Sequence, residues 1–198
     1  MTEPALLLLA SGLSSRFGRS NKLLAHFHDR PLCSHAADYW PHRPARLKFV
    51  VLPENETDLR PIFEQRNWTI LKNPSPDAGQ SVSVKIGIQA AMAASATTAM
   101  ICLADMPLVP ASHLDVVLSE AVSHQAVMSS SQGTLMPPAA FHQNLFDELT
   151  KLSGDQGAKS VFLKCNKRVS VELPAGTHLD VDTPEDLAII KAEQQRYA

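Results

Sequence analysis

The stretch ASGLSSRFGRSNK, residues 10–22, combines glycines, hydroxyl side chains and cations without a single acidic residue. Gly12 and Gly18 permit positive φ angles and close backbone approach, which leaves amide N–H groups free to face an anion. Three side chains add positive charge: Arg16, Arg19 and Lys22. The spacing fits neither a Walker A loop nor a G-x-G-x-x-G fingerprint. The stretch predicts a local anion site, and the alternative is a flexible, solvated connection.

Two acidic segments follow apolar or extended stretches later in the chain. Asp105 comes directly after the apolar run TAMICLA, residues 98–104. Asp180 and Asp182 alternate in LDVDTPEDLA, so on an extended stretch they point the same way. Carboxylates so placed suit Mg²⁺, which takes one or two of them plus phosphate oxygens, and Asp182 is the preferred second ligand. Asp186 is expected only to favour the dipole of the helix that follows. The alternative for Asp105 is a turn cap.

The elements that must position these residues alternate along the chain. Six short apolar runs predict strands: 5–10, 48–53, 68–73, 98–104, 126–131 and 168–173. Seven segments predict helices: 32–40, 58–66, 81–95, 112–123, 143–152, 156–164 and 184–196. Several strands are apolar at successive positions, as expected when helices cover both faces of a sheet.

Such alternation predicts an α/β fold, a three-layer, mainly parallel, doubly wound Rossmann-like sheet. Ligands of such folds bind at the carboxyl ends of the strands. Residues 10–22 and Asp105 follow predicted strands, so they are expected at that edge. Residues 129–139, SSSQGTLMPPA, are the most loop-like segment and are expected to carry an excursion over the sheet. A basic, glycine-containing loop and acidic side chains at the same edge of the sheet predict a site for a nucleoside triphosphate and its metal ion.

Length and composition limit the class of protein. The chain has 198 residues with 44% hydrophobic and 19% charged residues, which suits one domain spanning residues 1–198. A net charge of −2 and a pI near 6.4 argue against nucleic-acid binding. Three dispersed cysteines suit a reducing cytoplasm. The apolar N-terminal run is too short for a signal peptide, and no run approaches membrane-spanning length. We therefore expect a cytoplasmic protein without nucleic-acid or membrane partners.

Five blocks of the chain, in order, resemble one family. Residues 9–24 resemble the signature L-A-A-G-x-S-x-R-M-G-x-x-K of nucleotidyltransferases related to the molybdenum cofactor enzymes, the MobA-like NTP transferases. DAGQSVSVKIGI is similar to the family's G-M-S-x-S-L segment, and LADMPLV is similar to its G-D-M-P-x-V. LSGDQGAK resembles its G-D-x-G-A-R, and LDVDTPEDLA its D-x-D-T-P-E-D-L. The branch most resembled is molybdenum cofactor cytidylyltransferase, which transfers CMP from CTP to the pterin phosphate.

The resemblance implies a role for each matching position and a sheet of the nucleotidyltransferase type. Arg16, Lys22 and Asp105 would be catalytic, the two cations neutralising the triphosphate and the departing pyrophosphate. Mg²⁺ would be held by Asp105 and Asp182. Nucleotide contacts would come from Ala10, Ser11, Gly12, Ser14, Gly79 and Ser81. The implied partners are a nucleoside triphosphate, a small phosphorylated acceptor such as a pterin, and a molybdoenzyme or maturation partner.

The departures from the family pattern leave two questions open. Ser11 replaces an alanine at a position that helps to separate cytidine- from guanosine-using relatives, so GTP is an alternative to CTP. Residues 136–141, MPPAAF, replace the family's G-H-P-x-x-F segment beside the acceptor. A sugar phosphate or an isoprenoid precursor is therefore an alternative acceptor. A catalytically silent nucleotide-binding module is the alternative outside enzymes.

Overall fold

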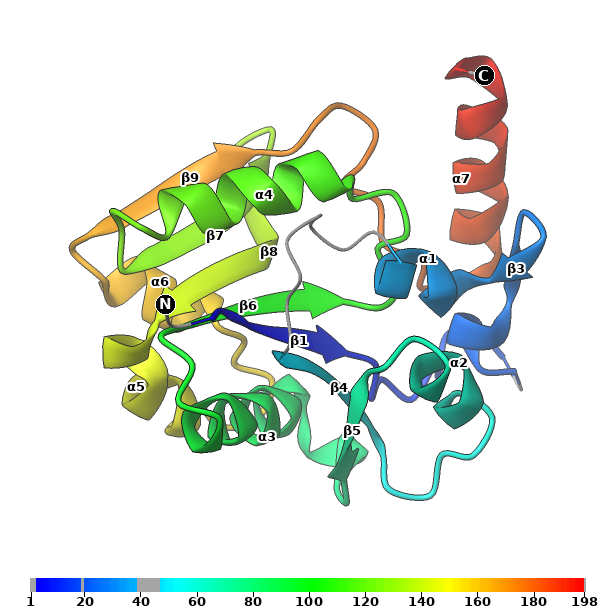
Figure 1. Ribbon diagram of the computed structural model, residues 1–198. Coiled ribbons are helices and arrows are strands. Elements are labelled where there is room, and N and C mark those ends of the chain that lie inside the picture. The colour runs from blue at the N-terminus through cyan, green and yellow to red at the C-terminus, as the bar shows by residue number, and fades with distance from the viewer. Residues whose placement is uncertain (1–2, 19, 39–46, 198) are drawn as a thin grey trace.

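A seven-stranded sheet runs through the middle of the molecule, with helices on both of its faces (Figure 1). The structure is a computed structural model that describes residues 3–18, 20–38 and 47–197. Arg19 and the predicted end of the first helix, at 39–40, lie outside the described residues. The strands of the sheet are β1 (Ala5–Leu9), β4 (Leu47–Pro53), β5 (Thr69–Asn73), β6 (Thr98–Leu103), β7 (Ala126–Ser131), β8 (Thr134–His142) and β9 (Arg168–Glu172).

The remaining elements surround this sheet. A small antiparallel pair consists of β2 (His26–Phe27) and β3 (Arg30–Pro31). The α-helices are α1 (Leu32–Asp38), α2 (Arg60–Glu64), α3 (Gln80–Ala93), α4 (Ala111–Glu120), α5 (Phe146–Thr150), α6 (Lys159–Lys164) and α7 (Pro184–Tyr197). Three single turns of 3₁₀ helix are η1 (Lys22–Leu24), η2 (Pro76–Ala78) and η3 (Gln143–Leu145).

Strand β1 lies near the centre of the sheet, whose order is β5-β4-β1-β6-β8-β7-β9. β1 pairs in parallel with both β4 and β6, β4 pairs in parallel with β5, and β7 in parallel with β9. All five side chains of β1 are buried, which explains why this strand is apolar at every position. The predicted α/β, mainly parallel and doubly wound sheet is confirmed.

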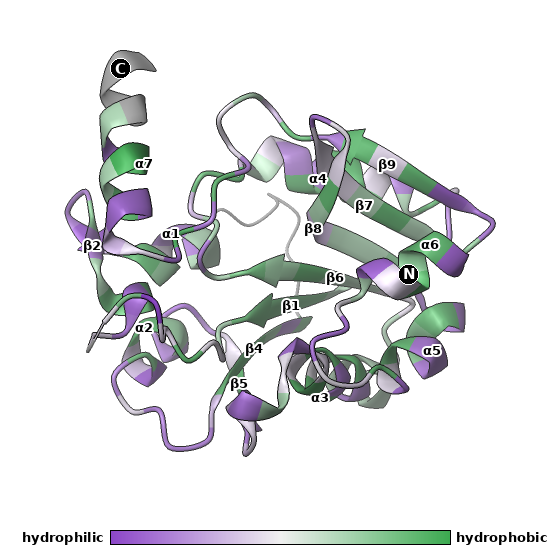
Figure 2. Ribbon diagram, turned by 180° about the vertical axis from the view of Figure 1, so that it is seen from behind, coloured by the Kyte–Doolittle hydropathy of each residue, from purple (hydrophilic) through white to green (hydrophobic). Residues whose placement is uncertain are grey.

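Alternate residues of the inner strands contribute to two separate cores. In β1, Leu6 and Leu8 pack in the core that α1, α2 and α4 cover, whereas Leu7 and Leu9 face α3, α5 and α6. Figure 2 shows the resulting concentration of hydrophobic residues along the strands. Helix α7 stands away from both layers, and the buried Ile190 attaches it to a small third cluster. Because β5, β4, β1 and β6 pair in parallel, their carboxyl ends lie at one edge of the sheet.

The prediction of a loop over residues 129–139 is wrong. Residues 126–131 form β7 as expected, but Thr134–His142 form β8, which is antiparallel and inserted between β6 and β7. Two consecutive prolines ordinarily argue against an inner strand, because proline cannot donate to the ladder. Here the β7–β8 register passes from Ala139 to Met136, so Pro137 and Pro138 fall in a bulge and replace no paired residue. The bulge reconciles the proline pair with the strand.

A buried serine–histidine pair stabilises this bulge. Ser129 donates its hydroxyl to the carbonyl of Pro138 (2.8 Å), and its oxygen lies 2.7 Å from His113 Nε2. The hydroxyl proton of Ser129 is used in the hydrogen bond to Pro138. His113 must therefore donate from Nε2 and cannot act as a base toward that hydroxyl. Burial lowers the pKa of His113, which keeps the ring neutral. The pair is structural, despite its resemblance to a catalytic dyad.

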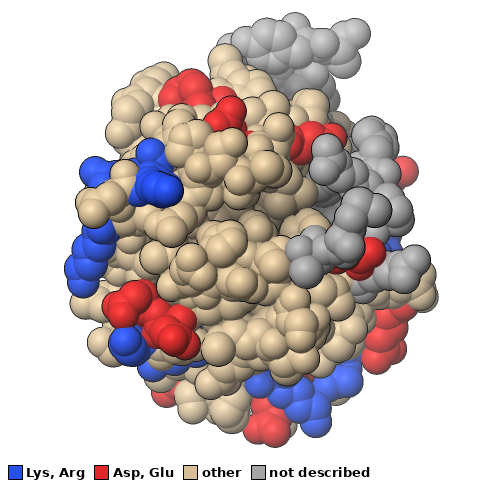
Figure 3. Space-filling view, turned by 60° about the vertical axis from the view of Figure 1, so that its left-hand side comes forward, with Lys and Arg blue, Asp and Glu red and all other residues tan. Residues whose placement is uncertain are grey.

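The surface carries both basic and acidic side chains. On the face shown in Figure 3, basic and acidic side chains occupy the margins, and other residue types fill the middle. No helix in the described part of the chain is long and apolar enough to cross a membrane.

Candidate functional site

The loop that follows β1 is shaped by its own side chains. Gly18 has φ of 92°, and Ser14 has φ of 52°, a left-handed conformation that non-glycine residues seldom adopt. The Ser14 hydroxyl accepts a hydrogen bond from the backbone N–H of Lys22 (3.2 Å) and donates to Asn21 Oδ1 (3.4 Å). The hydroxyl of Ser14 thus ties the loop to the backbone of Lys22.

Lys22 joins the two acidic segments that were predicted to meet at this edge. Its ammonium donates to Asp105 Oδ2 at 2.6 Å and to Asp182 Oδ1 at 2.7 Å. The Lys22 side chain is only 8% exposed, and those of Asp105 and Asp182 are 18% and 26% exposed. Arg16 contacts the second oxygen of Asp182 at 2.7 Å from a largely solvated position. The structure therefore brings together Arg16, Lys22, Asp105 and Asp182.

Two local features hold Asp182 at this place. The backbone N–H of Val181 donates to the carbonyl of Asp105 (3.0 Å), which attaches the C-terminal segment beside the end of β6. The Asp186 carboxylate accepts the N–H groups of Asp182 (3.0 Å) and Thr183 (2.7 Å), while Thr183 Oγ1 accepts the N–H of Asp186 (3.1 Å). This reciprocal capping box makes Asp186 a positioning residue. The expectation that Asp186 only favours the helix dipole is wrong.

The electrostatics of the cluster are dominated by the attraction between Lys22 and its two carboxylates. Burial alone would lower the pKa of Lys22, but the attraction and hydrogen bonds of Asp105 and Asp182 outweigh it and raise that pKa. Burial raises the pKa of Asp105, and the charge of Lys22 opposes the rise. The Oδ1 atom of Asp105 is buried and has no hydrogen-bond partner among the described residues. Two carboxylates with an unused oxygen fit a hard divalent cation, provided that a substrate supplies further oxygens.

A polar pocket of about 150 Å³ opens beside this cluster. Its lining comes from Gly12, Leu13, Ser14, Ser15, Arg16, Lys22 and Asp182. A Cβ built on Gly12 would meet no protein atom within 4 Å, so the protein itself does not require glycine there. Space of this kind is useful where a ligand approaches the backbone closely. The 59% exposed Leu13 stands in the same wall.

Ser11 and Ala10 lie beneath the loop and do not line this polar pocket. Both are buried, and the Ser11 hydroxyl accepts a hydrogen bond from Asn73 Nδ2 at 3.0 Å. The same amide nitrogen donates to Ser83 Oγ at 3.1 Å, so Asn73 ties the end of β5 to both β1 and α3. Sequence reasoning missed Asn73, because a lone asparagine at the end of a strand carries no periodic signal. Of its two partners, Ser11 lies 62 positions away in the sequence and Ser83 lies on α3.

Gly79 and Ser81 form a second contact region, at the start of α3. Gly79 has φ of 93°, and a Cβ there would collide with the carbonyl of Gly154. The backbone N–H of Ser81 donates to that same carbonyl at 3.2 Å, and the Ser81 side chain is buried. The loop at 153–157 therefore rests directly on the first turn of α3. These two residues stand apart from the polar pocket, whose lining does not include them.

The chain matches a family model over residues 6–169, which cover the sheet from β1 into β9. That model describes the MobA-like NTP transferase domain. The chain belongs to this family. Within this MobA-like protein, the segment that carries Asp182 lies beyond the matched residues, so its place in the site comes from the structure. The resemblance inferred from the five sequence blocks is confirmed at the level of the family.

Two curated relatives match this MobA-like chain over part of their length. The purine catabolism protein PucB of Bacillus subtilis (strain 168) is 30% identical over 130 residues, 64% of this chain and 63% of that protein. The 2-C-methyl-D-erythritol 4-phosphate cytidylyltransferase of Rhodopirellula baltica is 29% identical over 148 residues, 66% of this chain and 60% of that protein. The chain thus spans roughly three fifths of the length of the curated relatives that it matches.

A solved structure confirms the fold over almost the whole chain. The crystal structure of Rv0371c from Mycobacterium tuberculosis H37Rv superposes with a TM-score of 0.80 at 20% identity, covering 96% of this chain and 98% of that one. The same mycobacterial protein is known in complex with manganese, with a TM-score of 0.69, 18% identity and coverage of 96% and 99%. At such identities the likeness concerns the fold.

Proposed function

We propose that this MobA-like protein is a nucleotidyltransferase that transfers CMP from CTP to the phosphate of molybdopterin or molybdenum cofactor, releasing pyrophosphate. The observation that carries the proposal is the position of Lys22, held between Asp105 and Asp182 beside a glycine-containing polar pocket. Arg16, Lys22 and Asp182 line this pocket, and Asp105 lies behind them on Lys22; such a set of two cations and two carboxylates suits a triphosphate with a divalent cation. Membership of the family supports the same reaction class.

The reaction requires little more than positioning and charge neutralisation. An oxygen of the acceptor phosphate forms a bond to the α-phosphorus of the nucleotide, and the bond from that phosphorus to the bridging oxygen of pyrophosphate breaks. The acceptor phosphate is already ionised near neutral pH, so the protein need not supply a general base. Arg16 and Lys22 would neutralise the charge that develops on the leaving pyrophosphate. The backbone around Gly12 would lie against the phosphates.

Asp105 and Asp182 are the residues that would hold the magnesium ion. When bound, the ion would neutralise negative charge on the phosphate oxygens. The unpartnered Oδ1 of Asp105 supports this assignment, as does the manganese complex of the mycobacterial neighbour. Asp186 would keep the Asp182 backbone in place, and Gly79 and Ser81 would lie on the side of the base and ribose.

Three alternatives remain to be separated by experiment. GTP could replace CTP, since Ser11 departs from the family pattern. The acceptor could be a sugar phosphate or an isoprenoid precursor, and the similarity to a methylerythritol phosphate cytidylyltransferase supports the latter. A silent nucleotide-binding module is disfavoured by the intact cluster of Lys22, Asp105 and Asp182.

Pyrophosphate release tests the proposal. The protein is incubated with Mg²⁺, each of the four nucleoside triphosphates in turn, and molybdenum cofactor or its metal-free pterin. Release with CTP and the pterin is expected, and Asp105→Asn should reduce it by at least 100-fold. Asp147→Asn, which changes an exposed carboxylate on α5 that does not line the polar pocket, is the matched control and should retain activity. Nucleotide binding without release for any acceptor would instead support the silent module.

A further inference from the structure

Strand β9 lies at one edge of the sheet and presents a row of backbone groups outward. Among the described residues it pairs with β7 alone (Figure 1). The carbonyl of Lys167 accepts a hydrogen bond from β7, and the N–H of Leu173 donates one to β7. Because successive residues of a strand alternate in direction, the N–H and C=O groups of Arg168, Ser170 and Glu172 face away from β7. An outward row of this kind is a template on which another strand can pair.

The sequence of β9, RVSVE, is self-complementary in charge. Its two ends carry opposite charges, on Arg168 and Glu172, and Ser170 lies in the middle. When two copies of the strand pair antiparallel about a two-fold axis at Ser170, each Arg168 lies opposite the partner's Glu172. Of the two-fold pairings, only the one centred on Ser170 brings these opposite charges face to face. A parallel pairing in register would place like charges together, which is destabilising.

The same two-fold axis also matches the backbone groups and the apolar side chains. Residues 168, 170 and 172 all face outward, so each pair across the axis exchanges two hydrogen bonds, which gives about six in total. On the face of the sheet covered by α4, Val169 would lie opposite the partner's Val171. Both valines are only partly buried within one chain. Cross-strand pairs of β-branched side chains stabilise a sheet.

The two charged ends of β9 have capacity for a partner's side chain. The exposed Glu172 carboxylate accepts from Ser130 Oγ (2.6 Å) and from the N–H of Gln132 (2.7 Å), and these bonds lower its pKa. Arg168 donates from Nη1 to the carbonyl of Cys165 (2.6 Å), and its guanidinium has further N–H groups. No ion pair involves either end residue in the ranges that the structure describes. Each end therefore offers a charge that its own chain does not neutralise.

The opposite edge of the sheet lacks this complementarity. Strand β5 has the sequence TILKN and carries one charged residue, Lys72. A two-fold pairing of β5 with itself therefore leaves Lys72 without a carboxylate from the partner strand. Lysine on an edge strand is one of the usual protections against pairing. Of the two edges, β9 is the one whose sequence favours a second copy.

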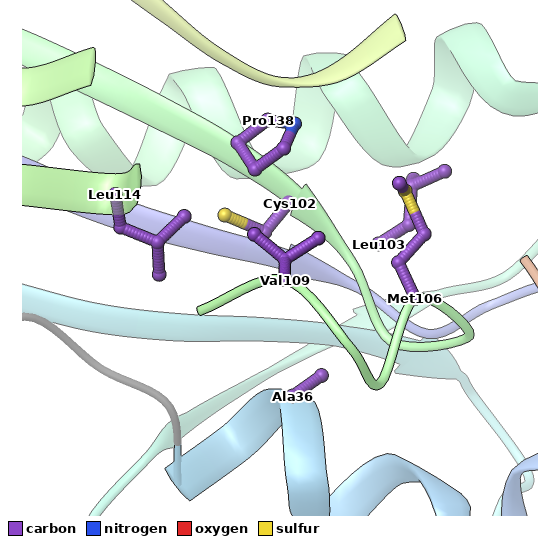
Figure 4. A pocket seen from close by; sticks show the side chains of 7 residues that line it. All are labelled: Ala36, Cys102, Leu103, Met106, Val109, Leu114 and Pro138. Atoms are coloured by element: carbon purple, nitrogen blue, oxygen red, sulfur yellow. The ribbon is translucent and has the colours of Figure 1, made fainter. Parts of the chain in front are cut away.

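The layer that supports β9 is closely packed. Val169 and Val171 share a hydrophobic cluster with Leu114 and Val117 of α4, which lies over β7 and β9 (Figure 1). The space between α1, β6 and α4 is about 20 Å³ and is lined by apolar side chains and Cys102 (Figure 4). That space holds about one water molecule. A strand held on a filled core loses little conformational freedom when a partner docks, which favours association.

We propose that β9 is a self-association surface, on which a second copy of this chain pairs antiparallel about a two-fold axis at Ser170 and continues the sheet into the partner. The proposal does not depend on the proposed function, because no described residue that lines the polar pocket belongs to β9. A contact of five residues from each copy belongs with the small, transient interfaces, below about 1,200 Å². We therefore expect a dimer that dissociates in the micromolar range.

Charge reversal tests the register of the pair. In sedimentation velocity from about 1 to about 300 µM, the wild-type mass should rise from 21.6 kDa toward twice that value. Arg168→Glu and Glu172→Arg should each weaken self-association at least tenfold, because each places like charges opposite each other at both ends of the pair. An equimolar mixture of the two variants should associate again, since every carboxylate of one then meets a guanidinium of the other. Lys72→Glu, on the β5 edge, is the matched control and should associate like the wild type.

A cross-link locates the two-fold axis. Ser170→Cys would place two thiols opposite each other, with Cα atoms about 5.5 Å apart, and the three native cysteines are buried. A short bis-maleimide should therefore join two Ser170→Cys chains. Thr69→Cys, at an exposed position of the β5 edge, is the matched control and should not be joined. If the charge variants do not fold, Ser170→Pro is used, because it removes only an N–H that faces away from β7; it should abolish the dimer.

Three results would overturn the proposal. A wild type that remains monomeric at every concentration has no such surface. A dimer that survives both charge reversals, or that survives Ser170→Pro, forms through another surface. A mixture of the two charge variants that associates no better than either variant alone contradicts the register. Pyrophosphate release enters none of these readouts, so failure of the dimer and failure of the proposed function are distinguishable.

Discussion

Replacing Lys22 by methionine should destabilise the protein by about 3 kcal/mol. The two carboxylate oxygens that share its ammonium cannot be farther apart than about 5 Å, given bonds of 2.6 and 2.7 Å. Two unit charges at that separation repel by about 3 kcal/mol at an effective dielectric constant near 20. Loss of one partner of a buried ion pair costs a similar amount, about 3–5 kcal/mol. Lys22→Met removes the cation and keeps the aliphatic volume.

Urea unfolding at neutral pH measures this loss. Lys151→Met is the matched control, because Lys151 pairs with Glu148 at 2.8 Å on the exposed surface. Such exposed pairs contribute at most about 1 kcal/mol. A second substitution, Asp105→Asn, should restore most of the stability lost in Lys22→Met, since it removes one of the two repelling charges.

A divalent cation should also restore the Lys22→Met protein. Mg²⁺ at about 100 times its dissociation constant would add roughly 2.7 kcal/mol, whereas the wild type, with the ammonium already between the carboxylates, should gain little without nucleotide. Unfolding of Lys22→Met at the same urea concentration as the wild type would refute the electrostatic reasoning. Equal stabilisation of both proteins by Mg²⁺ would refute the idea that Lys22 occupies the place of a cation.

Three further predictions concern the surroundings of the site. Gly79→Ala should cost at least 2 kcal/mol more in urea unfolding than Gly133→Ala, because both have positive φ but only the first Cβ collides with backbone. Acidification below about pH 6.5 should reduce the free energy of unfolding by up to about 1.4 kcal/mol per pH unit through His113. The reason is that His113 binds a proton in the unfolded chain, whereas burial lowers its pKa in the folded protein. In unfolding curves measured at pH 5 to 7, His113→Asn should reduce this slope. Asp186→Ala should cost about 1 kcal/mol in stability and at least tenfold in pyrophosphate release, because the backbone of Asp182 loses its support; full activity in a folded variant would contradict the positioning role.

The sequence was most informative where burial determined residue type. Leu6, Leu7 and Leu8 are apolar in succession because both faces of β1 are covered, and that pattern predicted the parallel sheet. Placing residues 10–22 and Asp105 after parallel strands likewise predicted that they lie at one edge, whereas the direct ion pairs of Lys22 with Asp105 and Asp182 were not predicted.

The rest depended on partners that local patterns do not reveal. Strand β8 was missed because Pro137 and Pro138 are turn signals, and only the pairing with β7 shows that they occupy a bulge. Asn73 was missed because its contact with Ser11 spans 62 positions of sequence. The role of Asp186 depends on backbone N–H groups that any residue would supply, so its identity alone predicted a dipole effect and not a support for Asp182.

The attachment of Val181 to Asp105 also has a consequence during synthesis. Lys22 and Asp182 are 160 positions apart. The loop that carries Lys22 is therefore synthesised long before the segment that carries Asp182, and the site is complete only when both are present. A nascent chain that stops before residue 180 would already contain every strand of the sheet, yet its lysine would face one carboxylate instead of two. Catalytic competence would therefore appear only after the sheet has been synthesised and the C-terminal segment has docked, which makes activity a late marker of folding.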